Sequence, residues 1–150
     1  MKKSLLPLIF LFSFGIVTAQ ETINFTFNHL ALSVKNLDES ATFYKQVLGL
    51  PEIINKTKME GVRWFSLNEG KELHLISLLK EPVIINKAVH LALTTSNFDA
   101  FLKSLEAKKI PYSDWPGIPN KINIRADGIK QIFFQDPNGY WIEINSVIQK

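Results

Sequence analysis

The sequence contains no cysteine. Disulfide bonds, thiolate metal ligands, cysteine nucleophiles and a lipid-anchored cysteine are therefore excluded. The formal net charge is only +3, and no Lys/Arg cluster stands out, so the chain lacks the basic surface expected of a protein that binds nucleic acid. Hydrophobic residues make up 46% of the 150 residues, which is enough to bury one core but too little chain for two ordinary independent domains.

Long apolar runs are also scarce, and the one present covers residues 5–17 near the N-terminus. A proline and a glycine interrupt it, and it is shorter than the roughly 20 residues that a membrane-spanning helix needs. Two lysines precede it and the small-residue sequence Val17-Thr18-Ala19 ends it, so the pattern predicts a signal peptide over residues 1–19, cleaved after Ala19, rather than a stable membrane anchor. We expect an exported protein, periplasmic or secreted, and cleavage lowers its net charge to +1.

The chain repeats itself at an offset of 61 residues. Asn28-His29-Leu30-Ala31-Leu32-Ser33-Val34 matches Val89-His90-Leu91-Ala92-Leu93-Thr94-Thr95, so that His-Leu-Ala-Leu occurs twice. The same offset places Asn36-Leu37-Asp38 on Asn97-Phe98-Asp99. The match therefore extends beyond one strand into the segment that follows it.

Each repeat predicts the order β-α-β-β-β. In the first copy Asn36 and Glu39 form a capping pattern, and apolar residues at helical spacing continue until Gly49. In the second copy a helix follows Ser96. Strands are predicted over 53–58, 62–67 and 72–79, near 111–114, and over 129–135 and 140–147, with turns at 68–70 and 136–139, a loop or irregular strand over 115–126, and a connection between the repeats over 81–87.

Both repeated histidines fall on the strand face that carries small residues. Since side chains alternate across a strand, Leu30 and Leu32 lie on one face and His29 on the other, and the second copy divides in the same way. A histidine in an apolar strand is more often a hydrogen-bonded core residue than a ligand, but the repeat favours a shared metal site. Glu143, between two isoleucines, is costly to bury unless it is paired or bound to metal. Imidazole and carboxylate ligands suit Zn, Ni, Fe, Co or Mn.

At these residues the chain resembles the vicinal oxygen chelate superfamily, which includes glyoxalases, bleomycin-resistance proteins and extradiol dioxygenases. The markers are residues 28–34, Ser40 through Phe43-Tyr44 to Leu48-Gly49-Leu50, residues 89–93, and residues 135–144 with their Asp-Pro-Asn-Gly turn. The resemblance implies an α+β fold in one domain, residues 25–148. Two βαβββ modules, about 25–80 and 87–148, would pair around a U-shaped metal cleft.

The resemblance also implies the ligands. One divalent metal (Ni, Zn, Co, Mn or Fe) would be held by His29, His74, His90 and Glu143, with Glu143 as the catalytic proton-transfer group. Glyoxalase I enzymes commonly carry Glu or Gln at the position of His74, whereas extradiol dioxygenases and fosfomycin thiol transferases use only the other three positions. A metal-bound His74 suits lyase or isomerase chemistry, and a free His74 leaves a facial triad suited to ferrous oxygen chemistry.

The leading functional hypothesis is a glyoxalase-like lyase or isomerase that acts on a small oxygen-chelating substrate through an enediolate-type intermediate. Export argues against a glutathione substrate. The alternatives are an iron-dependent extradiol-type dioxygenase and a non-enzymatic small-molecule binding protein of the bleomycin-resistance kind. A fosfomycin thiol transferase ranks last, because its cation-binding loop is not matched.

Further expectations concern the surroundings of the site. Arg125 and Trp141 are candidate substrate-binding residues, although Arg125 could instead pair with Asp127, and Arg63 is expected to form surface ion pairs. A homodimer with two shared sites is the expected assembly. Six lysines are expected to be solvated surface residues: Lys71, Lys80, Lys87, Lys103, Lys108 and Lys109.

Overall fold

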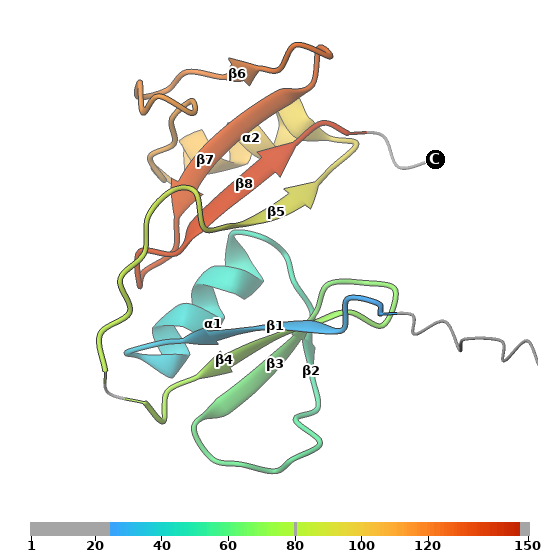
Figure 1. The fold of residues 1–150 in the computed structure, drawn as a ribbon, viewed down its shortest axis with the longest axis vertical. Coiled ribbons are helices and arrows are strands. Elements are labelled where there is room, and N and C mark those ends of the chain that lie inside the picture. Colours follow the sequence, from blue (N-terminus) through green and yellow to red (C-terminus); the bar gives the residue numbers. More distant parts are fainter. Residues whose placement is uncertain (1–24, 80, 148–150) are drawn as a thin grey trace, which may run out of the picture.

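The computed structural model describes residues 25–79 and 81–147, so the predicted signal peptide lies outside the described residues. The chain forms two modules, each with one helix and a four-stranded sheet (Figure 1). The predicted α+β fold of two βαβββ modules is confirmed. The first module contains β1 (His29–Ser33), α1 (Leu37–Gln46), β2 (Glu52–Ile53), β3 (Val62–Ser66) and β4 (Glu72–Ile76), and the second contains β5 (His90–Thr94), α2 (Phe98–Ala107), β6 (Asn123–Ile124), β7 (Lys130–Gln135) and β8 (Trp141–Asn145).

The two sheets have the same topology. Their strand orders are β1-β4-β3-β2 and β5-β8-β7-β6, and in each sheet the first and last strands of the module pair in parallel while the other pairs are antiparallel. In the first sheet His29 lies beside Glu72 and Ala31 beside His74. In the second, Ala92 lies beside Glu143. The repeated strands β1 and β5 are both edge strands.

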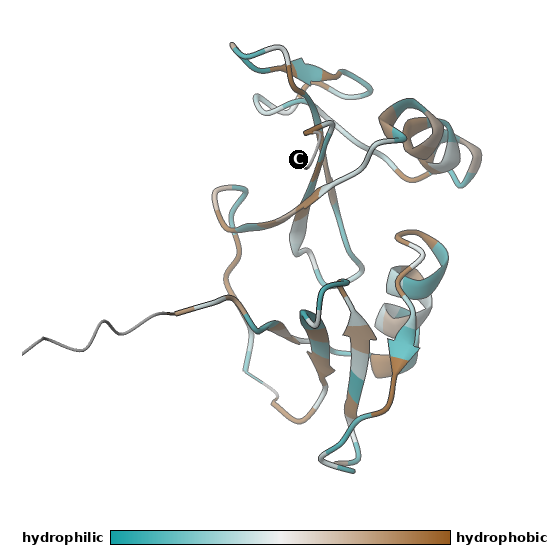
Figure 2. Ribbon diagram, turned by 90° about the vertical axis from the view of Figure 1, so that its right-hand side faces the viewer, coloured by the Kyte–Doolittle hydropathy of each residue, from teal (hydrophilic) through white to brown (hydrophobic). Residues whose placement is uncertain are grey.

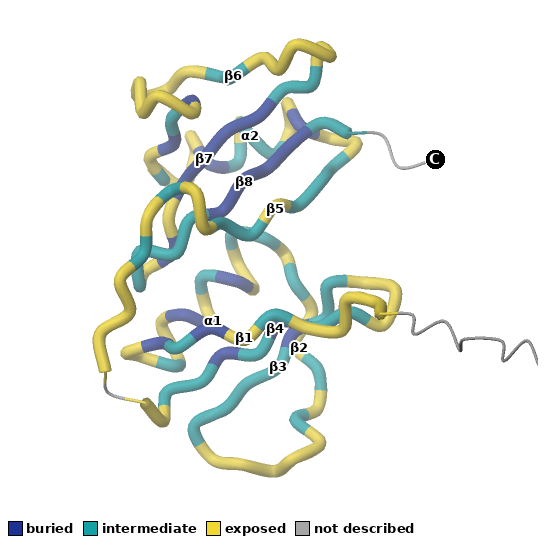
Figure 3. The backbone as a smooth tube through the Cα atoms, in the orientation of Figure 1, coloured by how far each residue is buried: buried dark blue, intermediate teal, exposed yellow. Residues whose placement is uncertain are grey.

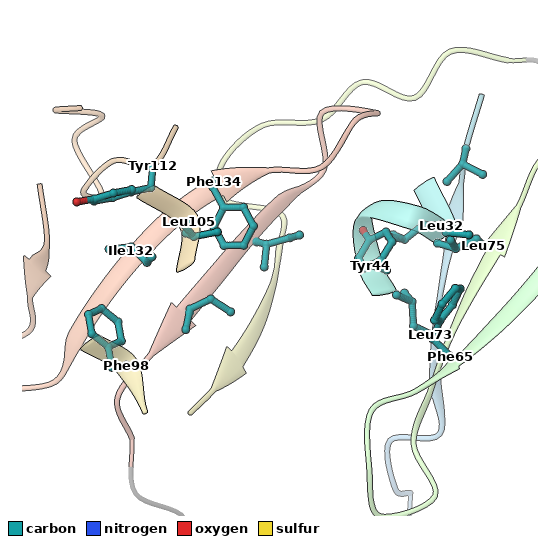
Figure 4. Close-up of a cluster of buried hydrophobic side chains, with 14 residues drawn as sticks. Leu32, Tyr44, Phe65, Leu73, Leu75, Phe98, Leu105, Tyr112, Ile132 and Phe134 are labelled. Atoms are coloured by element: carbon teal, nitrogen blue, oxygen red, sulfur yellow. The ribbon is translucent and has the colours of Figure 1, made fainter. Parts of the chain in front are cut away.

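One face of each sheet packs against its helix, and the other face carries the histidines. Both helices lie on the same side of the molecule (Figure 2). Each module has its own group of buried apolar side chains, including Leu32, Leu73 and Leu75 in the first and Ile132 and Phe134 in the second (Figure 4). Strands β7 and β8 are the most deeply buried, whereas β1 and β5 are partly exposed (Figure 3). The opposite face of each sheet, called the open face below because no helix covers it, carries the candidate site residues. On the second sheet this face is largely buried, including Phe133 and Glu143.

A buried hydrogen-bond network joins the modules. The hydroxyl of Tyr44 on α1 donates to Asp136 Oδ2 at 3.1 Å, in the turn between β7 and β8. In the same turn, Asn138 Nδ2 donates to Ser40 Oγ at 2.8 Å, and the Tyr140 hydroxyl donates to a carbonyl at the end of β1. Burial raises the pKa of both Tyr44 and Asp136. The Asp-Pro-Asn-Gly turn thus fixes the second module to the first.

Two strand predictions are wrong. No strand forms over 111–114, where Ser113 makes only isolated bridges and the module's second strand is β6 instead. Pro111 lacks a backbone donor there, and an Asp114 carboxylate oxygen accepts from the backbone N–H groups of Gly117 and Ile118, which turns the chain. The predicted strand 53–58 ends at residue 53, because the Asn55 side chain accepts from the N–H two residues on and starts a turn.

Within residues 25–79 and 81–147, neither helix is long and apolar enough to cross a bilayer.

Candidate metal centre

His90 and Glu143 form one half of the candidate site, on the open face of the second sheet. Strand alternation on β5 and β8 places both side chains on the face opposite α2. His90 Nε2 lies 3.4 Å from Glu143 Oε2, and the glutamate side chain is only 8% exposed. His90 Nδ1 lies 2.9 Å from the carbonyl oxygen of Lys87, which can only accept a hydrogen bond, so the ring proton is on Nδ1. In the neutral ring, Nε2 then presents its lone pair to the carboxylate.

Two side-chain amides hold the other oxygen of Glu143. Gln131 Nε2 and Asn145 Nδ2 each donate to Oε1 at 2.8 Å, and Gln131 is itself fixed by a hydrogen bond from Asn123. Oε2 is left facing His90. A lone pair and a carboxylate oxygen that face each other repel unless a proton or a cation lies between them, so the donor set fits a divalent metal. Gln131 is not among the predicted site residues, although strand alternation against Ile132 and Phe134 places it on this face.

His29 and His74 lie together on the open face of the first sheet. Their rings stack with centroids 4.4 Å apart at an angle of 16°, and the other face of the His74 ring stacks on Trp64 at 4.1 Å and 7°. His29 Nδ1 donates to Asn28 Oδ1 at 2.7 Å, so its Nε2 is free to bind metal. His74 differs, because its Nε2 lies 2.8 Å from Glu72 Oε2 and donates to that carboxylate. Strand alternation on β4 places Glu72 on the same face as His74, although Glu72 is not among the predicted site residues.

The four predicted ligands therefore lie as two pairs, His29 with His74 and His90 with Glu143. In the part of the chain that the structure describes, no three or more His, Asp or Glu side chains come close enough together to hold an ion. One chain on its own thus presents two half-sites rather than one complete centre.

Lys87 closes one end of the second half-site, which corrects the expectation of a solvated side chain. Its ammonium donates to Ser113 Oγ and to the carbonyls of Asp114 and Trp115, at 3.1, 2.6 and 3.1 Å. It also lies over three aromatic rings, with the Trp141 centroid at 4.7 Å. Burial lowers the pKa of Lys87. Lys87 therefore ties the loop at 113–115 to the strand that carries His90.

The candidate substrate-binding residues lie in different surroundings. Trp141 is half-buried on the open face of β8, the same face as Glu143. Arg125 is 43% exposed and its guanidinium pairs with Asp127 at 2.8 Å, which is the surface arrangement weighed for it above. Arg63 forms surface ion pairs, as predicted, with Glu52 at 2.7 Å and with Asp38 at 2.9 Å. The hydrogen bond to Glu52 raises the pKa of Arg63 and lowers that of the glutamate.

A groove of about 800 Å³ runs between the modules along the edge strand β5. Its wall is mostly apolar and includes Leu91 and Leu93 from β5 with Leu30, Leu48 and Leu50 from the first module. His90 also lines the groove. Apolar surface beside an unpaired strand edge is typical of an interface with another chain.

The fold agrees with the comparisons. Residues 26–144 match the family model of the Glyoxalase/Bleomycin resistance protein/Dioxygenase superfamily, and the chain belongs to that family. It is 31% identical over 128 residues to a protein named glyoxylase I 4 from Arabidopsis thaliana, covering 78% of this chain and 68% of the relative. It is 26% identical to a lactoylglutathione lyase from Schizosaccharomyces pombe, covering 79% of this chain and less than half, 46%, of that protein. The fold of a glyoxalase/dioxygenase from Nostoc punctiforme is similar, with a TM-score of 0.66, 24% identity, and coverage of 88% of this chain and 100% of that one.

Proposed function

We propose that the protein is a metal-dependent lyase or isomerase of the glyoxalase type, acting on a small substrate that chelates metal through adjacent oxygens. The observation that carries the proposal is the second half-site, in which the lone pair of His90 Nε2 faces Glu143 Oε2 at 3.4 Å. Family membership and the names of the two relatives support a lyase-type activity.

The complete centre is assembled in a homodimer. The His29 half-site of one chain combines with the His90–Glu143 half-site of the partner, which gives two equivalent sites for each dimer. Three features support this arrangement: the half-sites lie apart in one chain, β1 and β5 each have one side without a partner strand among residues 25–79 and 81–147, and an apolar groove follows β5.

Each residue of the centre has a role that follows from its contacts. A divalent ion held there supplies Lewis acidity that polarises a substrate carbonyl. Glu143, a ligand that the substrate can displace, would use Oε2 to take the proton from the hydroxyl-bearing carbon beside that carbonyl and return it to the carbonyl carbon, while the hydroxyl proton passes to the former carbonyl oxygen. Gln131 and Asn145 hold Oε1, so the carboxylate cannot rotate away from the substrate. Trp141, on the same face, forms an apolar wall.

The glutathione part of the yeast relative's substrate is not assigned to this chain. The predicted signal peptide over residues 1–19 implies export, whereas glutathione is an intracellular thiol. The proposed substrate class is a small α-hydroxycarbonyl compound, whose adjacent oxygens can chelate the ion and whose hydroxyl-bearing carbon carries the proton to be moved.

Metal analysis and complementation test the centre and its assembly. We expect about one Ni, Zn, Co or Mn ion per mature chain, lost in His29→Ala and in His90→Ala. Co-expression of these two variants forms heterodimers in which one of the two shared sites is intact, and a statistical mixture regains about a quarter of the wild-type metal. Metal bound within a single chain would regain none, and a wild-type protein that binds no metal would overturn the proposal.

The chemistry is tested by proton exchange. Nuclear magnetic resonance in deuterated water would follow deuterium uptake beside the carbonyl of small hydroxycarbonyl compounds, and we expect Glu143→Gln to abolish the catalysed uptake while the fold is retained.

The alternative is an iron-dependent extradiol-type dioxygenase. It is favoured by the hydrogen bond from His74 Nε2 to Glu72, because without His74 the remaining His29, His90 and Glu143 make up two imidazoles and one carboxylate. Iron in the isolated protein, together with oxygen consumption on a catechol, would support it.

A further inference from the structure

The hydrogen bonds of the three histidines divide them into two kinds. His29 and His90 occupy equivalent positions in the two repeats, and each donates its Nδ1 proton to an oxygen, at 2.7 and 2.9 Å. Both rings therefore present a free Nε2. His74 is the reverse, since its Nε2 proton is donated to Glu72 Oε2 at 2.8 Å. Its Nε2 is therefore not available to a metal.

Ring stacking also separates His74 from the centre. A metal ion binds an imidazole nitrogen along the lone pair, which lies in the plane of the ring. The planes of His29 and His74 are nearly parallel, at 16°, with centroids 4.4 Å apart. One ion cannot lie in two parallel planes that are stacked on each other. Trp64 holds the other face of the His74 ring at 4.1 Å, so the ring is fixed on both sides.

Glu72 has a free donor atom that a metal ion can reach, which His74 Nε2 is not. It is the direct neighbour of His29 across the parallel β1–β4 pair, and strand alternation places both side chains on the open face. Its Oε2 accepts from His74, while Oε1 has no hydrogen-bond or ion-pair partner among residues 25–79 and 81–147. The side chain is 21% exposed, so the free oxygen can be reached.

The two half-sites then match in their chemistry. Glu143 has one oxygen held by side-chain donors and the other facing the free Nε2 of His90. Glu72 has one oxygen held by His74 and the other free, beside His29 with its free Nε2. Each module contributes one imidazole, one carboxylate, and side chains that hold the carboxylate in place.

We propose that Glu72, rather than His74, is the fourth protein ligand of the shared metal centre, and that His74 is a positioning residue that holds Glu72. The inference rests on the proposed function. The donor set becomes two imidazoles and two carboxylates, which suits Ni, Co, Zn or Mn. Four protein ligands also distinguish the centre from the three-ligand set of an iron dioxygenase.

Imidazole counting tests this assignment without reference to activity. X-ray absorption spectroscopy at the metal edge of the wild-type dimer would find two imidazoles per ion, and the count would stay at two in His74→Gln. Titration calorimetry would show metal affinity lowered by at least about 100-fold in Glu72→Gln and by about 10-fold in His74→Ala, with most of the affinity recovered in His74→Gln, whose amide can donate to Glu72.

The matched control is a glutamate outside the candidate site. Glu60→Gln changes an exposed glutamate in the turn before β3 and leaves metal affinity unchanged. Circular dichroism checks that Glu72→Gln retains the wild-type fold. Three imidazoles in the wild type, with metal retained in Glu72→Gln, would overturn the inference and leave the proposed function standing. A wild-type protein without metal affinity would overturn both.

Discussion

Removing the hydroxyl of Tyr44 tests the junction between the two modules. Tyr44→Phe deletes the hydrogen bond to Asp136 Oδ2, which joins α1 to the turn between β7 and β8. After the change, Oδ2 keeps only a longer contact with Asn138 Nδ2 at 3.5 Å, while Oδ1 keeps its two backbone donors. A hydrogen bond to a charged group contributes about 1.5–3 kcal/mol, so we expect the free energy of unfolding near neutral pH to fall by about 2 kcal/mol.

The size of this effect depends on pH, with a sign that follows from the buried carboxyl. Burial raises the pKa of Asp136 above its ordinary value of 3.8. Its contribution to stability is therefore fully present below the unfolded pKa and is lost as pH rises through the folded pKa. The Tyr44 hydroxyl opposes this shift, because its hydrogen bond favours the ionised carboxylate. Tyr44→Phe should thus cost about 2 kcal/mol at neutral pH and about 1 kcal/mol near pH 3, where the carboxyl is neutral.

Urea unfolding of the mature protein at the two pH values measures both numbers. Tyr140→Phe is the control, because its hydroxyl donates at 3.0 Å to the neutral carbonyl of Ser33. Its cost should be about 1 kcal/mol and independent of pH over this range. A Tyr44→Phe cost below about 0.5 kcal/mol, or one that does not grow with pH, would refute the account of this junction.

Three further predictions concern individual contacts. Lys87→Met removes three hydrogen bonds to the loop at 113–115, so the free energy of unfolding should fall by about 2 kcal/mol. The fluorescence of Trp115 should also shift, and an unchanged spectrum would contradict the role of Lys87 in holding this loop. Gln131→Leu releases Glu143, so calorimetry should show metal affinity about 10–100-fold lower with the fold intact. Gly61→Ala should be more destabilising than Gly70→Ala in urea unfolding. Both residues have positive φ, which costs about 1–2 kcal/mol for alanine, but a Cβ at Gly61 would also lie 2.7 Å from a leucine methyl while that at Gly70 meets nothing within 4 Å.

The fold was predictable because its signals are local and repeated. The duplicated His-Leu-Ala-Leu sequence marks β1 and β5, and period-two alternation assigns His29 and His90 to the face opposite the helices. The first helix begins where its cap predicts, with Asn36 Oδ1 accepting from the N–H of Glu39 at 3.2 Å. Strand β6 is two residues long, and its sequence has too few alternating positions to signal it.

The interactions within the site were less predictable, because alternation gives the face of a side chain but not its partner. Lys87 resembled the other lysines in sequence, and only the fold brings three carbonyl or hydroxyl oxygens to its ammonium. His74 was grouped with the metal ligands by position, yet Trp64 and Glu72 determine the orientation of its ring. Neither relation follows from spacing along the chain.

The proposed division of the centre between two chains implies that metal binding depends on protein concentration. A site formed within one chain binds metal with the same affinity at any dilution. A site that takes His29 from one chain and His90 with Glu143 from its partner exists only in the dimer, so metal binding and dimerisation stabilise each other. We expect the apparent metal affinity to fall when the protein is diluted below its dimer dissociation constant, and excess metal to shift the monomer–dimer equilibrium towards dimer in sedimentation velocity. Gln135→Ala, which removes an exposed side chain at the end of β7 that donates to the Gly139 carbonyl in the following turn, should behave as the wild type does. An affinity that does not change across the dissociation range would place both half-sites in one chain, and the separation of the two pairs seen here would then have to close by movement of the modules.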